Sequence, residues 1–338
     1  MSHIETLDWP AQIMPASKHI IPHLKELQEK YGMSNYPIDP YVAVFKIRDN
    51  VWAMYAPCTH AMADNWLYLV EGPEKALFID NGWGFGDLKG LGEQLTGKPV
   101  LSAVTHFHLD HCGGNPQWDE IYSHTFTADM LESFMDDYDK WWKQFNRVGE
   151  AEHRHYYKDE DLVPFKVYKA LHLPNHHIIN LGADYDIELI HIGGHTSGDS
   201  CFLDKKSRIL FSGDTMFEKR RNVATSIIPS TRAYKNIHRE YLGISYYCAQ
   251  IKLLAARMDE FDSVMPGHSH IDCSPKIAAG VSNAAQAIVA DPYSYDRVID
   301  RKGRKVYMKD GGTACIIYDV EDVKENLKLY PVDSWDKV

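Results

Sequence analysis

The alternation of apolar and polar residues over the first hundred positions predicts one helix and then two pairs of strands. Apolar residues at helical spacing in IIPHLKELQEKYG predict a helix within residues 9–34 that ends at a glycine. Strand-like runs on either side of Asp49-Asn50, and again around Gly72-Pro73, predict two hairpins. The segment DLKGLGEQLTG then predicts a short helix that leads into the strand VLSAVT.

The pattern changes over residues 125–175, where segments such as ADMLESFMDDYDKWWKQF are charged, aromatic and helical, with little strand character. We interpret this range as an inserted helical cap. Strand pairs return in DYDIELIHIGG and DSCFLDKKSRILFSGD, and a helical stretch from about Ala233 to Met258 precedes the strand SVMPGHS. The last part, residues 274–338, predicts a helix and the hairpin RVIDRKGRKVYMKDGGTACIIYDV.

Composition and charge narrow the class of protein. The 338 residues are 44% hydrophobic and 25% charged, which is typical of a globular chain with a sizeable core. A formal net charge of −11 disfavours nucleic acid as a partner, because phosphate backbones would be repelled. The start lacks a basic region followed by an apolar run, and no stretch has the apolar length of a membrane span, so we expect a cytoplasmic protein without a membrane partner.

The six cysteines are widely spaced and form no CxxC pair, which is typical of reduced, buried thiols. Cys112 differs from the other five because it directly follows a histidine of the cluster described next, where it is placed to line a site.

Candidate chemistry begins with THFHLDHCGGN, which follows a predicted strand and places His106, His108, Asp110 and His111 within six residues. Two histidines separated by one residue reach the same ion only from extended or looped backbone. Imidazole nitrogen and carboxylate oxygen suit zinc, manganese or iron. Three further residues follow apolar runs and glycine-containing turns, as a metal site at one sheet edge requires: His195 in IGGHTSGD, Asp214 in LFSGDT and His268 in MPGHSH.

The ordered motifs HFHLDH, GGHTSGD, SGDT and PGH resemble those of the metallo-β-lactamase superfamily over roughly residues 42–270. The resemblance implies an α+β fold, a four-layer αβ/βα sandwich with a helical insertion. It implies one domain over residues 1–338, with extensions over 1–41 and about 274–338. It also implies the ligands of two metal ions: His106, His108 and His195 for one, Asp110, His111 and His268 for the other, and Asp214 as a bridge.

Two positions distinguish branches of that superfamily. The best-known β-lactamases carry a cysteine where this chain has Asp214, so the chain instead resembles the glyoxalase II, lactonase and phosphodiesterase branches. Flavodiiron oxygen reductases carry a glutamate where this chain has His108, and no flavodoxin-like module is present. Antibiotic hydrolysis and that redox chemistry are therefore disfavoured.

Two adjacent cations lower the pKa of a shared water from near 16 to about 7, so a metal-bridging hydroxide exists at neutral pH. Asp110 is expected to orient this hydroxide and move its proton. Asp80, in FIDNG, is expected to be the partner of a ligand histidine or to cap a turn. The expected cofactors are two divalent ions, zinc first, with iron or manganese as alternatives.

Other candidate residues have two interpretations each. The run Lys219-Arg220-Arg221 either pairs with a substrate carboxylate or phosphate or forms a solvated basic turn. Four aromatic residues of the insert form either a wall over the site or the core of the cap: Trp141, Trp142, Tyr156 and Tyr157. The histidines at 153–155 and 176–177 lack carboxylates at ligand spacing, so no third metal is expected there.

The leading hypothesis is a binuclear zinc-dependent hydrolase that cleaves an ester-like bond, whether ester, thioester, lactone or amide, in a small molecule. Three alternatives stay open: a mononuclear iron persulfide dioxygenase, a small-molecule phosphodiesterase and a non-catalytic metal-dependent binding or sensor module. The substrate and the oligomeric state, including a homodimer, are not specified by these motifs.

Overall fold

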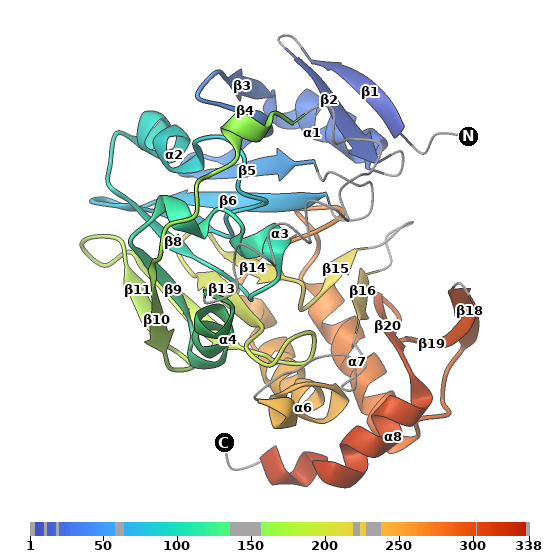
Figure 1. Ribbon diagram of the computed structural model, residues 1–338. Coiled ribbons are helices and arrows are strands. Elements are labelled where there is room, and N and C mark those ends of the chain that lie inside the picture. Colours follow the sequence, from blue (N-terminus) through green and yellow to red (C-terminus); the bar gives the residue numbers. More distant parts are fainter. Residues whose placement is uncertain are drawn as a thin grey trace. The chain divides into compact units, whose positions relative to one another are not determined.

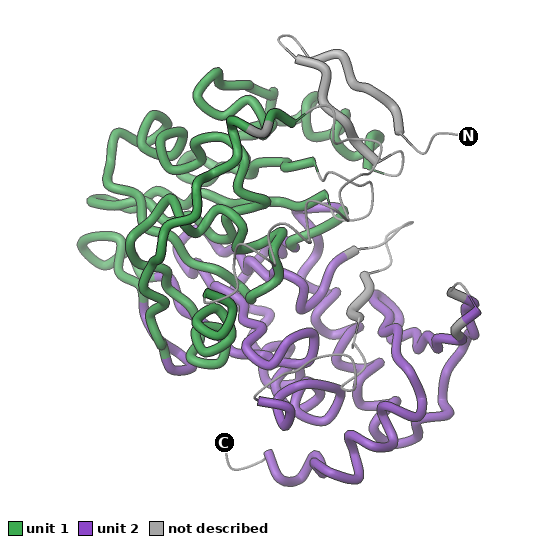
Figure 2. Tube along the Cα trace, viewed as in Figure 1, with its two compact units in different colours: residues 1–173, 179–186, 267–269 green, residues 174–178, 187–266, 270–338 purple. Residues whose placement is uncertain are grey.

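The structure is a computed structural model that describes eight ranges of the chain: 4–9, 12–17, 20–57, 64–135, 157–218, 224–227, 238–301 and 303–335. The chain divides into two compact units (Figure 2). Unit 1 consists of residues 1–173, 179–186 and 267–269, and unit 2 consists of residues 174–178, 187–266 and 270–338.

Unit 1 is built on an eight-stranded mixed sheet in the order β10-β9-β8-β7-β6-β5-β4-β3 (Figure 1). Neighbours from β3 to β7 are antiparallel, whereas β7, β8, β9 and β10 are parallel to one another. The strands are β3 (Ser34–Tyr36), β4 (Asp39–Arg48), β5 (Val51–Ala56), β6 (Asn65–Glu71), β7 (Ala76–Ile79), β8 (Val100–Ala103), β9 (Glu120–His124) and β10 (Lys169–Leu173). The remaining elements are the hairpin β1 (Ile4–Trp9) and β2 (Gln12–Ser17), and the helices α1 (Ile21–Tyr31), α2 (Leu88–Thr96), α3 (Leu109–Cys112) and α4 (Thr125–Met135).

The local sequence explains these elements. Every residue of β5 is buried, and its alternating side chains Trp52, Met54 and Ala56 pack in one apolar cluster. Helix α2 begins where the Asp87 side chain accepts a hydrogen bond from the Gly90 amide, as an N-cap does. It buries its leucines in the same cluster, so it covers that face of the sheet.

Unit 2 contains most of a five-stranded sheet in the order β11-β12-β13-β14-β17, of which residues 179–180 of β11 are assigned to unit 1, and all of a second sheet in the order β15-β16-β20-β19-β18. The strands are β11 (Ile178–Asn180), β12 (Asp186–His191), β13 (Ser200–Asp204), β14 (Ile209–Gly213), β15 (Phe217–Glu218), β16 (Ala224–Ile227), β17 (Ser263–Pro266), β18 (Arg297–Arg301), β19 (Arg304–Asp310) and β20 (Ala314–Tyr318). The helices are α6 (Ile244–Ala255), α7 (Lys276–Ala290) and α8 (Val320–Leu329). Apolar residues of α6, α7 and α8 share one core with β12, β13, β14 and β20.

The predicted hairpins around Asp49-Asn50 and Gly72-Pro73 are present as β4-β5 and β6-β7, and the predicted helices α1 and α2 are present with them. Several differences appear, among them the hairpin β1-β2, which was not predicted. The predicted helical cap over 125–175 contains the strand β10, which pairs with β9, and residues 136–156 lie outside the described ranges.

Two other differences concern helices. The long helix predicted from Ala233 to Met258 is shorter as α6, which begins at Ile244 after a single 3₁₀ turn at Arg239–Tyr241. Helix α8 was not predicted. In the part of the chain that the structure describes, every helix is too short or too polar to cross a membrane.

Candidate metal centre

The parallel neighbours β7 and β8 bring Asp80 and Thr105 together, because both residues follow the carboxyl ends of their strands. Ile79 pairs with Ala103, and the Asp80 amide donates to the Ala103 carbonyl at 2.9 Å. The Asp80 carboxylate accepts hydrogen bonds from the Thr105 amide at 2.7 Å and from the Thr105 hydroxyl. Asp80 has a φ of 65°, a left-handed conformation that is rare for a residue other than glycine, and these hydrogen bonds stabilise it there.

The same carboxylate orients His111, which lies in the short helix α3 (Figure 1). His111 Nδ1 lies 2.7 Å from Asp80 Oδ2, and both side chains are buried. An ionised carboxylate only accepts hydrogen bonds, so Nδ1 carries the proton and a neutral His111 presents the lone pair of Nε2. A carboxylate behind a histidine in this way is the usual support of a metal ligand.

A backbone carbonyl orients His268 in the way that the Asp80 carboxylate orients His111. Its Nδ1 donates to the carbonyl oxygen of Asp64 at 2.9 Å, so its Nε2 also presents a lone pair in the neutral form. The segment around His268 is bound to β6, because the Trp66 amide donates to the Gly267 carbonyl and the Trp66 indole donates to the Ser269 carbonyl, both at 2.8 Å.

Three acceptor atoms therefore converge. The two Nε2 atoms of His111 and His268 lie 3.3 Å apart, and Asp110 Oδ2 lies 3.1 Å from Nε2 of His268 and 3.5 Å from Nε2 of His111. Lone pairs at these distances repel one another unless protons or a cation lie between them. A single divalent cation removes the repulsion, and two imidazoles with a carboxylate are ligands that zinc prefers, so these residues fit a metal ion.

Burial raises the pKa of Asp110, but positive charge at His111 and His268, or in their neutral form a cation bound between their Nε2 atoms, outweighs it and holds this pKa well below its usual range. Asp110 is therefore a carboxylate at neutral pH. Its backbone carbonyl accepts a hydrogen bond from the Asn65 side-chain amide, which fixes the first turn of α3 against β6.

The two remaining histidines of the first motif lie beside this group in unit 1. The ring centroid of His106 is 4.2 Å from that of His111 and 4.6 Å from that of His108. Nδ1 of His106 lies 3.0 Å from the Thr105 hydroxyl oxygen. Unit 1 thus brings together five of the seven ligands that the motifs suggested: His106, His108, Asp110, His111 and His268.

Unit 2 contains the other two suggested ligands. His195 follows β12 and Asp214 follows β14, and His195 Nε2 lies 3.3 Å from Asp214 Oδ2.

Lys219, Arg220 and Arg221 lie outside the described residues. So do Trp141, Trp142, Tyr156 and the histidines at 153–155, whereas Tyr157 is buried and stacks on Tyr41 with ring centroids 5.2 Å apart.

Sequence reasoning missed the groups that hold the histidines in place. Thr105 is the first residue of the motif THFHLDH, so its place beside the ligand histidines could have indicated it. The Asp64 carbonyl and the Asn65 side-chain amide had no such signal, because only the fold brings the first to His268 and the second to the Asp110 carbonyl. The glycines after the motif allow close packing: a Cβ on Gly114 would lie 2.3 Å from the Asn81 carbonyl oxygen.

Cys112 does not line the candidate centre. Its side chain is buried in the apolar cluster of unit 1, and its thiol donates to the Phe107 carbonyl at 3.2 Å. Burial, with the negative charges of Asp110 and Asp80, raises the pKa of the thiol well above its usual range, so Cys112 is a neutral structural residue.

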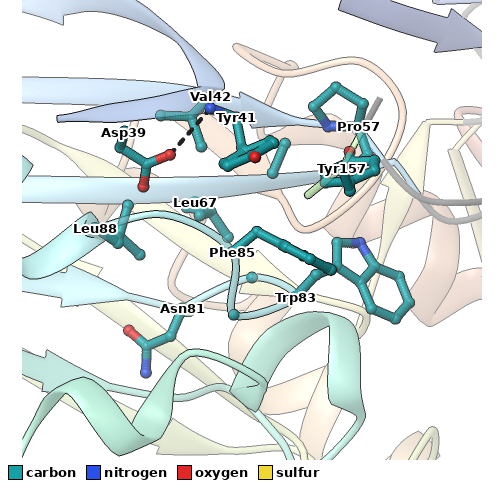
Figure 3. Close-up of a pocket in the computed structure, with 13 residues that line it drawn as sticks. Asp39, Tyr41, Val42, Pro57, Leu67, Asn81, Trp83, Phe85, Leu88 and Tyr157 are labelled. Atoms are coloured by element: carbon teal, nitrogen blue, oxygen red, sulfur yellow. Dashed lines mark hydrogen bonds between the residues drawn. The ribbon is translucent and has the colours of Figure 1, made fainter. Parts of the chain in front are cut away.

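A cavity in unit 1 lies against the segment that follows Asp80 (Figure 3). Its walls are mostly apolar and aromatic. Asn81 lines it, and the backbone amide of Asn81 donates to the His111 carbonyl at 2.7 Å. Asp39 is the buried acid of this cavity. One carboxyl oxygen accepts from the Tyr41 amide at 3.1 Å, and the other has no hydrogen-bond partner among the described residues. Burial, with nearby Asp87 and Asp161, raises the pKa of Asp39 to about 8.

Asp129, Glu132 and His172 form a further group in unit 1 with metal-binding side chains. Glu132 lies 3.0 Å from Nε2 of His172, whereas Asp129 lies 3.6 Å from Nδ1. The carboxylates thus contact opposite nitrogens of one exposed ring. We interpret the group as surface ion pairs.

A family model of the metallo-beta-lactamase superfamily matches residues 64–268. The match covers more than half of the chain, and the chain belongs to this superfamily. The crystal structure of DIM-1 metallo-beta-lactamase exposed to ceftazidime has a TM-score of 0.50 and 19% identity, and the alignment covers 73% of this chain and 98% of that chain. Together these findings confirm the predicted α+β metallo-β-lactamase-like fold.

Three relatives, from cow, human and chicken, carry the name acyl-coenzyme A thioesterase MBLAC2. The human protein is 30% identical over 164 residues, which are 45% of this chain and 58% of the human protein. The chicken protein is 27% identical over 229 residues, which are 64% of this chain and 76% of that protein. The chain therefore matches little more than half the length of the human relative.

Proposed function

We propose that this protein is a metal-dependent hydrolase that cleaves the thioester bond of an acyl-coenzyme A. The convergence of His111 Nε2, His268 Nε2 and Asp110 Oδ2 carries the proposal, because a divalent cation fits between these acceptors and relieves their repulsion. The names of the relatives support the substrate class. A thioester is one of the ester-like bonds that the motifs favour.

We further propose a ligand set for two divalent ions, with zinc first. One ion is assigned to His106, His108 and His195, the other to Asp110, His111 and His268, and Asp214 is shared. The order of the motifs and the contacts within each unit support this assignment. When bound, such ions acidify a water and polarise the substrate carbonyl.

The residues of the chain supply orientation and proton handling. Asp80 holds the Nδ1 proton of His111, so that ring cannot turn its other nitrogen away from the centre. Asp110, ionised at neutral pH, is assigned the role of accepting a proton from the attacking water.

The charge of the chain sets a requirement for substrate binding. With a net charge of −11, the protein repels the phosphates of coenzyme A unless positive charge gathers near the site. We assign this role to Lys219, Arg220 and Arg221, the basic run that follows Asp214.

The test is release of free thiol from acetyl-, octanoyl- and palmitoyl-coenzyme A by protein purified without chelators. His111→Ala should lower kcat/KM by roughly 100-fold or more, because it removes an assigned metal ligand. Asp129→Asn is the matched control, since it alters an aspartate near a histidine in the same unit but outside the centre. It should leave the rate unchanged.

A parallel panel of esters, lactones, phosphodiesters and glutathione persulfide separates the alternatives. Turnover of a lactone or phosphodiester without any thioester would overturn the proposed substrate class. Oxygen consumption with the persulfide would support the dioxygenase. A fully metal-loaded protein that converts nothing would support a binding or sensor module.

A further inference from the structure

His191, the last residue of β12, is a buried histidine that belongs to none of the metal-ligand motifs. Its Nε2 lies 2.7 Å from the Ser197 carbonyl oxygen, and its Nδ1 lies 2.9 Å from the Tyr246 hydroxyl. A carbonyl only accepts, so Nε2 carries the proton and Nδ1 accepts from Tyr246. A neutral His191 imidazole therefore donates one hydrogen bond and accepts one, and both of its ring nitrogens are hydrogen-bonded.

The environment keeps this ring neutral. Burial lowers the pKa of His191 to about 4, and the nearby His238 acts in the same direction. Tyr246 is fixed in turn, because its ring lies at right angles to Tyr241 and Trp335, with centroids 4.9 and 5.0 Å away. The hydrogen-bonded chain from Tyr246 through His191 therefore ends on one defined acceptor, the Ser197 carbonyl.

Ser197 lies in the turn that carries His195. The amides of Ile192 and Gly193 both donate to the Asp199 carbonyl at 2.9 Å, which closes this turn at its base. His191 holds the middle of the same turn through Ser197.

A second set of contacts joins this turn to the one that carries Asp214. The Thr215 hydroxyl donates to Asp199 at 2.9 Å, and the Tyr247 hydroxyl donates to the Thr215 carbonyl at 2.9 Å. The turn is also packed too closely for a side chain at Gly194, where a Cβ would lie 2.5 Å from Tyr247. Two successive residues of α6, Tyr246 and Tyr247, thus contact both ligand-bearing turns.

We propose that His191 and Tyr246 are positioning residues that hold the Ser197 carbonyl, and through it the His195 ring, in the place where it faces Asp214. This proposal rests on the proposed function only in taking His195 and Asp214 as metal ligands. The chemistry it needs is a neutral ring that both donates and accepts, a requirement that phenylalanine cannot meet and that glutamine meets on the donor side.

The experiment measures Co²⁺ binding by competition with a chelating dye, together with the visible spectrum of bound Co²⁺, in the absence of substrate. Tyr246→Phe removes one oxygen and keeps the ring, and it should weaken Co²⁺ binding about 10-fold and shift the spectrum. His191→Phe should weaken it by about 10- to 100-fold, and His191→Gln should restore part of the loss.

Tyr318→Phe is the matched control, because it removes a buried hydroxyl of unit 2 that donates to the Pro292 carbonyl, away from both turns. It should lower the melting temperature without changing Co²⁺ binding. If Tyr246→Phe and His191→Phe behave like this control, the two residues only stabilise the fold and the proposal is overturned. A wild-type chain that binds no Co²⁺ also overturns it.

Failure of the proposed function gives a different result. A protein whose Co²⁺ binding responds to His191 and Tyr246 but which hydrolyses no thioester would support the positioning role and contradict the proposed activity.

Discussion

The carboxylate of Asp80 determines which nitrogen of His111 is available to a cation, because it holds the proton on Nδ1. The Asp64 carbonyl does the same for His268. The sequence could indicate Asp80, since an acid at the end of a strand precedes the histidine motif. A backbone carbonyl has no signal in the sequence, so the partner of His268 could come only from the fold.

Asp39, the buried acid of the cavity in unit 1, makes the stability of the protein depend on pH. Its pKa is raised to about 8 in the folded chain from an ordinary value of 3.8, so between these pH values the folded state binds a proton that the unfolded state has lost. The free energy of unfolding should therefore fall as the pH rises from about 4 to about 8. Asp39→Asn should remove this loss and raise stability by roughly 2 kcal/mol near pH 8.

Urea unfolding at about pH 5 and about pH 8.5 measures this effect. Asp49→Asn, on the exposed turn between β4 and β5, is the control and should follow the wild type at both pH values. The idea fails if Asp39→Asn shows the same change in unfolding midpoint between the two pH values as the wild type.

At the scale of elements, hydrophobic pattern and turn residues were sufficient for two local hairpins of unit 1, whereas the short hairpin β1-β2 was not predicted. The hairpins β4-β5 and β6-β7 have long apolar runs on either side of a turn. Strand β10 has only two buried residues of five and depends on pairing with β9, more than forty positions earlier, which the local pattern does not reveal. Helix α8 was missed because one of its few buried positions is the polar Asn326.

Asn326 is a buried polar residue of α8 whose side chain contacts the start of α6. Its side chain accepts from the Ser245 amide at 2.9 Å and donates to the Leu242 carbonyl at 3.0 Å, so it caps the start of α6 from a different helix. The N-cap residue of α6 is Gly243, which has no side chain for this purpose. Asn326→Ala should lower the free energy of unfolding by about 1–3 kcal/mol, because it leaves two buried backbone groups without partners.

Chemical unfolding of Asn326→Ala, Asn326→Asp and Lys328→Ala tests the cap. Asn326→Asp keeps the acceptor for Ser245 and should lose less stability than Asn326→Ala, whereas Lys328→Ala, on the exposed face of α8, should resemble the wild type. Equal loss in Asn326→Ala and Lys328→Ala would contradict a capping role.

For the whole molecule, the sequence predicted the family and the fold because the ligand motifs follow strand ends in a fixed order, and the family match confirms both. The contacts of His106, His108, Asp110, His111 and His268 show how one unit gathers residues more than 150 positions apart. Substrate choice could not be predicted in the same way. It depends on the surfaces around the centre, for which the residues between the motifs carry no recognisable pattern.

Metal analysis of protein purified without chelators tests most directly whether this chain holds the two divalent metal ions that we propose for it. We expect about two zinc ions per chain in the wild type and about one in Asp110→Ala, because that change removes a ligand from one ion only. A metal-free wild type, or a single iron per chain that Asp110→Ala leaves in place, would contradict the claim.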